Sequence, residues 1–92
     1  MVPEGFRVMF DYRGNGRETV SVLNPLSHTV VYIGDLIMGE DGFWSYWPAE
    51  YRSGGFPGWL LMRIAENIAE LNAPMEKSLN EYFGEQNASS NT

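Results

Sequence analysis

The chain has 92 residues, and its three Trp, five Tyr and five Phe provide a core for one small domain. Twelve acidic against six basic residues give a net charge of −6, which disfavours direct binding of nucleic acid or of an anionic membrane. The absence of cysteine excludes disulfides and thiolate sites, and no apolar run is long enough to span a bilayer. We expect a soluble intracellular domain without a signal peptide.

The first quarter of the chain predicts a β-hairpin. Residues 6–12 alternate between two faces, and residues 18–23 return with the same alternation. Arg13-Gly14-Asn15-Gly16, between them, has the composition of a hairpin turn, because Gly and Asn tolerate positive φ angles. The most β-prone stretch, residues 29–33, predicts the next strand.

Further strands are expected before residue 48. Gly34-Asp35 is interpreted as a turn into a strand at residues 36–38, with a bulge inside one longer strand as the alternative. Residues 39–42 predict another turn, and residues 43–47 an aromatic strand that ends before Pro48. These segments together predict an antiparallel meander of four to five strands.

The second half of the chain changes to helical periodicity. Apolar residues recur at spacings of three and four over residues 60–71, which predicts one main amphipathic helix. Pro57 suits the first turn of this helix, whereas Asn72 marks its end. A short C-terminal helix is expected to start at Pro74 and to stop at Gly84.

These elements predict an α+β fold in which the helices pack on one face of the sheet. We expect residues 1–84 to form a single domain and residues 85–92 to form a flexible polar tail.

An aromatic segment is the most unusual part of the sequence, because residues 43–59 hold seven of the thirteen aromatic residues. Both faces of the strand at residues 43–47 are aromatic, but a packed helix can cover only one of them. The other face must be covered by something else or be exposed to solvent. Aromatic residues of this kind anchor many protein interfaces. The predicted protein contacts are Trp44, Tyr46, Tyr51 and Trp59; the alternative is that Trp44 and Tyr46 pack under the following loop or in a dimer contact.

A glycine-rich turn precedes the main helix. Backbone N–H groups of Gly54 and Gly55, the Arg52 guanidinium and the Trp59 ring provide a conceivable site for a small nucleotide. The segment matches neither common phosphate-binding loop. The alternative is that the glycines only reverse the chain between strand and helix.

Catalytic chemistry has little support in this sequence. His28 is the only histidine and has no carboxylate at a characteristic spacing. No set of His, Asp and Glu shows metal-ligand spacing. We therefore expect no enzymatic activity, no cofactor and no metal.

Acidic residues gather on the predicted helices. Glu66 and Glu70 are neighbours on one helical face, and Glu81 lies on the following helix. Such a surface resembles a phosphate array and suits a basic groove on another protein. The alternative is that these charges only keep the protein soluble.

The order Asp41-Gly42-Phe43-Trp44, Trp47-Pro48, Gly54-Gly55 and Leu71-Asn72-Ala73-Pro74 resembles that of small phage and prophage accessory proteins. In these proteins a short β-meander with an aromatic strand precedes a Gly-Gly turn and an amphipathic helix. The resemblance covers residues 30–83 and carries no catalytic or binding residue with it. It implies a protein of the bacterial host cytoplasm that inhibits antiviral defence, sometimes as an anti-CRISPR-like DNA mimic and sometimes by sequestering a signalling nucleotide.

Three functions follow as hypotheses. The first is a non-enzymatic inhibitor that binds a host protein, such as a nucleic-acid-binding one, through its acidic and aromatic surface. The second is a small-ligand binder that uses Arg52, Gly54, Gly55 and Trp59. The third is a structural homodimer in which the aromatic strands of two copies pair.

Overall fold

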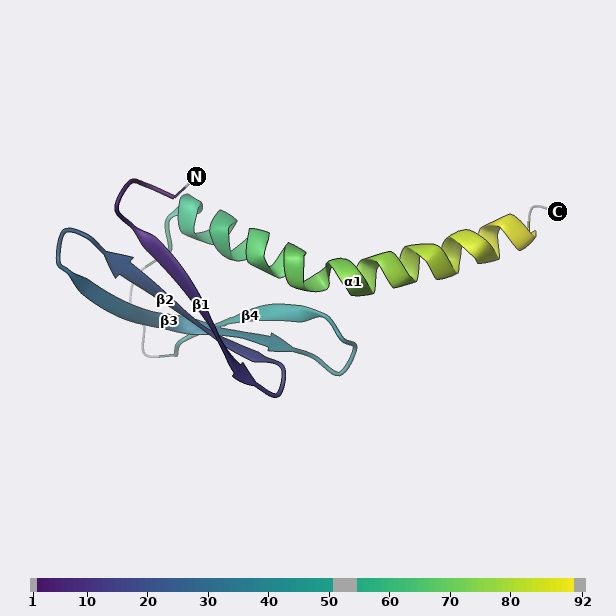
Figure 1. Ribbon diagram of the computed structural model, residues 1–92, viewed down its shortest axis with the longest axis horizontal. Helices are drawn as coiled ribbons and strands as arrows, with labels where there is room; N and C mark the ends of the chain where they lie inside the picture. Colours follow the sequence, from purple (N-terminus) through teal and green to yellow (C-terminus); the bar gives the residue numbers. More distant parts are fainter. Residues whose placement is uncertain (1, 51–54, 91–92) are drawn as a thin grey trace.

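The fold consists of one open antiparallel sheet and one long helix, which confirms the α+β class (Figure 1). The computed structural model describes residues 2–50 and 55–90 of the chain. Within this part, the sheet has the order β1-β2-β3-β4, so that every strand pairs with its neighbour in sequence. The elements are β1 (Arg7–Gly14), β2 (Arg17–Asn24), β3 (Thr29–Met38), β4 (Trp44–Pro48) and α1 (Gly58–Ser90).

The prediction of a separate fifth strand at residues 36–38 is wrong, because β3 runs through Gly34 and Asp35 without a turn. The pairing of β2 with β3 shifts register between Val20 and Ser21, so that Gly34 lies at a bulge. Gly34 has a φ of +152°, and a Cβ atom there would collide with the backbone oxygen of Trp47. The bulge therefore requires glycine at this position. The alternative prediction, a bulge within one longer strand, is confirmed.

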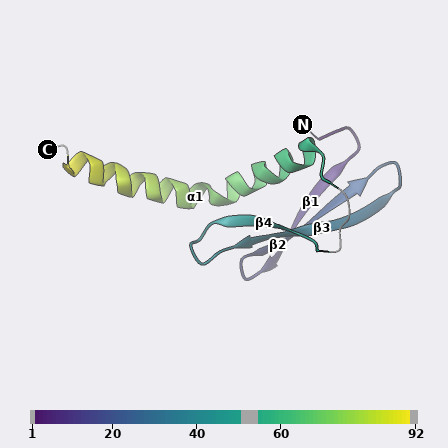
Figure 2. The same ribbon diagram turned by 180° about the vertical axis from the view of Figure 1, so that it is seen from behind.

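The prediction of a separate C-terminal helix is also wrong, since α1 continues through Asn72 and Pro74. Proline lacks the N–H that would bond back to the preceding turn, and its ring crowds the carbonyl of that turn, so a helix that continues past proline bends there. Figures 1 and 2 show α1 changing direction near its middle. Gly84 does not stop α1, whose backbone includes residues 85–90; the flexibility of a tail at residues 85–92 stays a prediction.

The core lies between one face of the sheet and the first half of α1 (Figure 2). Alternation along the strands directs one set of side chains toward the helix, and the three-four spacing of α1 directs its apolar residues back toward the sheet. The fully buried members are Val20, Ile33, Leu36, Leu60 and Ile64. The other face of the sheet has no helix over it within the described residues.

A buried amide joins α1 to the edge of the sheet. Asn72 Oδ1 accepts a hydrogen bond of 2.7 Å from the backbone N–H of Trp44, and Asn72 Nδ2 donates one of 3.3 Å to the backbone oxygen of Trp44. Because β4 is an edge strand, these backbone groups have no strand partner beyond them. Asn72 therefore takes the place of a neighbouring strand at Trp44 instead of ending the helix.

We expect Asn72→Ala to lower the free energy of unfolding by about 1–3 kcal/mol, because both backbone groups of Trp44 lose their partner in a half-buried position. Chemical denaturation followed by circular dichroism measures this change. Asn80→Ala is the matched control, since Asn80 is exposed on the same helix, and we expect it to leave stability within about 0.5 kcal/mol of the native value. Equal stabilities of the two variants would contradict a structural role for the amide.

Candidate interaction surfaces

The two residues of β4 that were predicted as protein contacts lie on its covered face. Trp44 and Tyr46 are half-buried and pack against the core beneath α1. The Tyr46 hydroxyl donates a hydrogen bond of 2.7 Å to the backbone oxygen of Ile33, which holds its ring inside the fold. Trp47 points to the other face and is 60% exposed, with its Nε1 donating to Ser45 Oγ at 3.1 Å. The exposed aromatic residue of this strand is therefore Trp47, which was not among the predicted contacts.

The glycine-rich segment before α1 lies partly outside the described residues, which exclude Tyr51, Arg52 and Gly54. Gly55 is exposed, and nothing lies within 4 Å of the position that its Cβ would occupy. Trp59 packs against Phe6 with ring centroids 5.2 Å apart. The structure therefore brings Trp59 to the N-terminal segment, and it does not test the grouping of Trp59 with Arg52.

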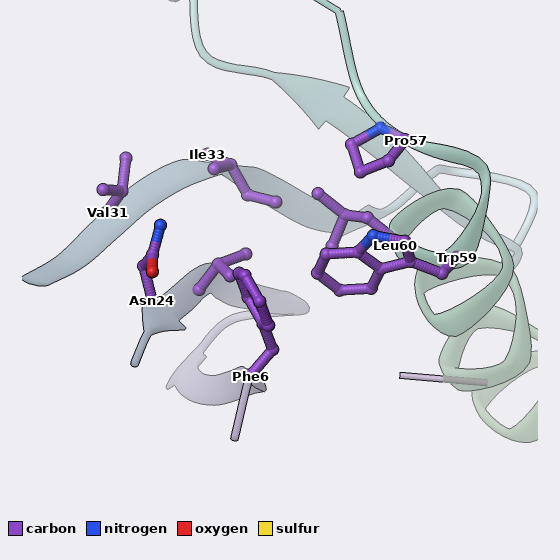
Figure 3. Close-up of a pocket in the computed structure, with 8 residues that line it drawn as sticks. Phe6, Asn24, Val31, Ile33, Pro57, Trp59 and Leu60 are labelled. Carbon is purple, nitrogen blue, oxygen red and sulfur yellow. The ribbon is translucent and has the colours of Figure 1, made fainter. Parts of the chain in front are cut away.

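Trp59 and Phe6 border a cleft of about 200 Å³ between the N-terminal segment, the sheet and the start of α1 (Figure 3). Asn24 has the only polar side chain among the lining residues, apart from the Trp59 indole N–H. The cleft therefore suits an apolar group and provides little for an anion. Its lining residues are Phe6, Val22, Asn24, Val31, Ile33, Pro57, Trp59 and Leu60.

The predicted acidic residues lie on one exposed side of α1. Glu66 and Glu70 are one helical turn apart, and Glu81, which is eleven positions after Glu70, returns to nearly the same side. The Glu66 side chain is 62% exposed, and its Oε2 lies 3.9 Å from Nη1 of Arg63. Lys77 occurs on this side as well. We call Glu66, Glu70 and Glu81 the acidic side of α1.

A polar cluster that the sequence analysis missed lies on the uncovered face of the sheet. The buried carboxylate of Asp35 accepts hydrogen bonds from Arg17 Nη2 at 3.0 Å and Nε at 3.3 Å, in a bidentate arrangement. The Tyr32 hydroxyl donates to the same carboxylate at 2.5 Å. Arg17 comes from β2, and Tyr32 and Asp35 come from β3. Strict strand alternation would place Tyr32 and Asp35, three residues apart, on opposite faces of the sheet, and the bulge at Gly34 brings them to the same face.

The charge of Asp35 affects both of its neighbours. Its hydrogen bond to the phenol, followed by partial burial, raises the pKa of Tyr32 above the ordinary value. Its hydrogen bond and its charge also raise the pKa of Arg17. Both shifts favour the neutral phenol of Tyr32 and the charged guanidinium of Arg17, as in a structural ion pair.

Other chemistry has no visible site in the part of the chain that the structure describes. No group of three or more His, Cys, Asp and Glu residues gathers there with the geometry of a metal site. His28 is exposed in the turn between β2 and β3 with a φ of +55°. Among the described helical residues, no stretch has the length and apolarity needed to cross a membrane.

We expect Asp35→Ala to lower the free energy of unfolding by about 1–3 kcal/mol, because Arg17 and Tyr32 lose a charged acceptor. The same variant lowers the pKa of Tyr32 toward 10, which absorbance titration of the phenol detects against Tyr32→Phe. Since folding favours the neutral phenol, the contribution of Tyr32 to stability is present below pH 10 and is lost as the pH rises through its raised pKa.

Asp11→Ala is the control for this cluster, since Asp11 is an exposed carboxylate of the neighbouring strand β1. An Asp35→Ala variant that matches Asp11→Ala in both stability and phenol titration would contradict the role of the cluster.

The chain was compared with protein-family models, curated proteins and solved structures, and none of them matches it. The resemblance to phage accessory proteins therefore stays a prediction from the sequence.

Proposed function

We propose that the chain is a non-enzymatic binding protein that contacts a partner protein through the acidic side of α1. The observation that carries this proposal is the placement of Glu66, Glu70 and Glu81 on one exposed side of a helix. The opposite side of that helix is occupied by the sheet over its first half. The partner surface that such an arrangement fits is basic.

The sheet gives the acidic side a defined geometry. Ile64 and Ile68, on the turns that carry Glu66, pack toward the core, so the first half of α1 is held in place. Each exposed charge pair contributes little to affinity, about 0–1 kcal/mol. A fixed row of charges, in contrast, steers a basic partner and selects its orientation.

The more specific proposal is inhibition of a host protein by mimicry of a phosphate array, inside a bacterium infected by a phage. It rests on the resemblance in the sequence and on the acidic side of α1. Trp44, Tyr46 and Trp59 are half-buried within the fold, so the exposed carboxylates are the larger part of the proposed contact.

We expect the double variant Glu66→Lys/Glu70→Lys to lose the capture of a basic partner protein from a bacterial lysate by at least tenfold, while its circular dichroism stays native. Both side chains are exposed, so charge reversal removes the attraction without disturbing the core. Captured protein is quantified by mass spectrometry at increasing salt, which should weaken the native interaction.

The matched control is Glu4→Lys/Glu40→Lys, which makes the same change of charge at exposed positions outside α1. If both double variants capture the partner as the native protein does, the acidic side of α1 is not the contact. If both lose it equally, only the net charge matters and the proposed surface is wrong.

The second candidate function is small-ligand binding, which the cleft beside Trp59 favours because its apolar lining suits the base of a nucleotide. Native mass spectrometry of protein purified from a bacterial host would then show a mass excess of a few hundred daltons, which Arg52→Ala removes. A clean mass of the ligand-free chain would leave protein binding as the proposal.

A further inference from the structure

The open sheet has two edges, which differ in how well they can accept another strand. At the β4 edge, Asn72 binds both backbone groups of Trp44, and Pro48 has no N–H to donate. At the opposite edge, β1 has eight residues and no strand beside it within the described part of the chain. The outward N–H and C=O groups of β1 therefore form a template on which a further strand can pair.

Two opposite charges lie on this edge strand. Val8 and Phe10 pack against the core. Strand alternation therefore places Arg7, Met9 and Asp11 on the uncovered face of the sheet. Arg7 and Asp11 are exposed, and neither has an ion-pair partner among the described residues. They are four residues, or about 13 Å, apart along the strand, which is too far for them to pair with each other.

We propose that two copies of the chain pair through β1, antiparallel about a two-fold axis at Met9. In this register each residue before Met9 faces the residue equally far after it in the other copy. Arg7 of each copy then faces Asp11 of the other, so that one contact forms two ion pairs. The outward backbone groups bond across the pair, and the two four-stranded sheets join into one sheet of eight strands.

Other registers lack these ion pairs. Moving the axis one residue forward, to Phe10, would place Arg7 opposite Arg13. Moving it two residues forward would place the two Asp11 carboxylates opposite each other, and like charges in direct opposition destabilise a strand pair. Moving it one residue back would place both charges opposite uncharged residues. Of these four axis positions, only Met9 gives attractive charge pairs.

The face of β1 that is directed toward α1 is complementary in the same register. Val8 faces Phe10 of the other copy, so that two apolar side chains at the border of the core extend each other. Tyr12 is 65% exposed in the single chain, and it faces Phe6 of the other copy. Phe6 packs against Trp59 with ring centroids 5.2 Å apart. An exposed aromatic ring therefore gains aromatic neighbours in the dimer.

The path of α1 leaves the edge of β1 accessible. The helix begins beside this strand, where Trp59 contacts Phe6, and it crosses the sheet to Asn72 at the β4 edge. Its second half extends beyond β4 (Figure 1). The two-fold axis of an antiparallel strand pair is perpendicular to the sheet, so both helices lie on the same face of the joined sheet. The contact uses no residue of the acidic side of α1, and the dimer is therefore independent of the proposed function.

The oligomeric state and a charge reversal test the proposal. Analytical ultracentrifugation of the full chain should give twice the mass of one chain at high concentration, with dissociation on dilution. Arg7→Asp should raise the dissociation constant by roughly tenfold or more, because both ion pairs of the symmetric dimer become repulsive. Asp11→Arg should have the same effect. Both side chains are exposed, so the circular dichroism of either variant should stay native.

Mixing the two variants separates a charge contact from damage to the strand. Arg7→Asp leaves two acidic side chains on the pairing face of β1, and Asp11→Arg leaves two basic ones. A mixed dimer of the two variants therefore regains two attractive pairs. An equimolar mixture should associate about as tightly as the native chain, although each variant alone associates weakly.

Lys77→Asp is the matched control, since it makes the same change of net charge as Arg7→Asp at an exposed position of α1. It should dimerise as the native chain does. A native chain that stays monomeric at millimolar concentration overturns the proposal. So does a dimer that Lys77→Asp weakens as much as Arg7→Asp, or a mixture of the two β1 variants that does not recover.

The register is tested by disulfide formation, because the native chain has no cysteine. Arg7→Cys and Asp11→Cys place single thiols that face one another in the proposed pair, and their mixed dimer keeps one native ion pair. The mixture should cross-link on mild oxidation. Either variant alone should not, since its two thiols lie about 13 Å apart in this register. Efficient cross-linking of a variant with itself would indicate another register and would overturn the proposed one.

Discussion

The packing of α1 across one face of the sheet is the constraint on which the rest of this structure depends. A four-stranded meander has no core of its own, and Val20, Ile33 and Leu36 are buried only because Leu60 and Ile64 lie against them. Asn72 then determines where the helix crosses the edge of the sheet, since its amide binds both backbone groups of Trp44. The position of this contact also decides how much of α1 extends beyond the sheet.

One helix therefore has two different environments. Its first half contributes apolar residues to the core and displays Glu66 and Glu70 on the side away from the sheet. Its second half has no sheet beneath it and displays Leu79 and Phe83 instead. The carboxylates of the first half form the surface that serves a basic partner in our proposal. The uncovered face of the sheet, which carries the Arg17–Asp35–Tyr32 cluster, lies apart from that surface.

Local patterns predicted most of the elements, since strand alternation and helical spacing are properties of neighbouring residues. They also placed Glu66 and Glu70 together on an exposed helical side. They failed where a residue type has two structural uses. Gly34 suits a turn or a bulge, and the pairing of β2 with β3 selects the bulge. Pro74 ends a helix or bends one, and here the helix continues past it.

The sequence by itself determined the α+β class, the acidic side of α1 and the lack of thiol chemistry, because these follow from composition and from short-range periodicity. Only the tertiary structure decided which aromatic face of β4 is covered, since both faces have the same pattern and the choice depends on where α1 packs. The same holds for the contact of Asp35 with Arg17 and for the bond of Asn72 to Trp44, because residues 18 and 28 positions apart meet only through strand register and helix docking.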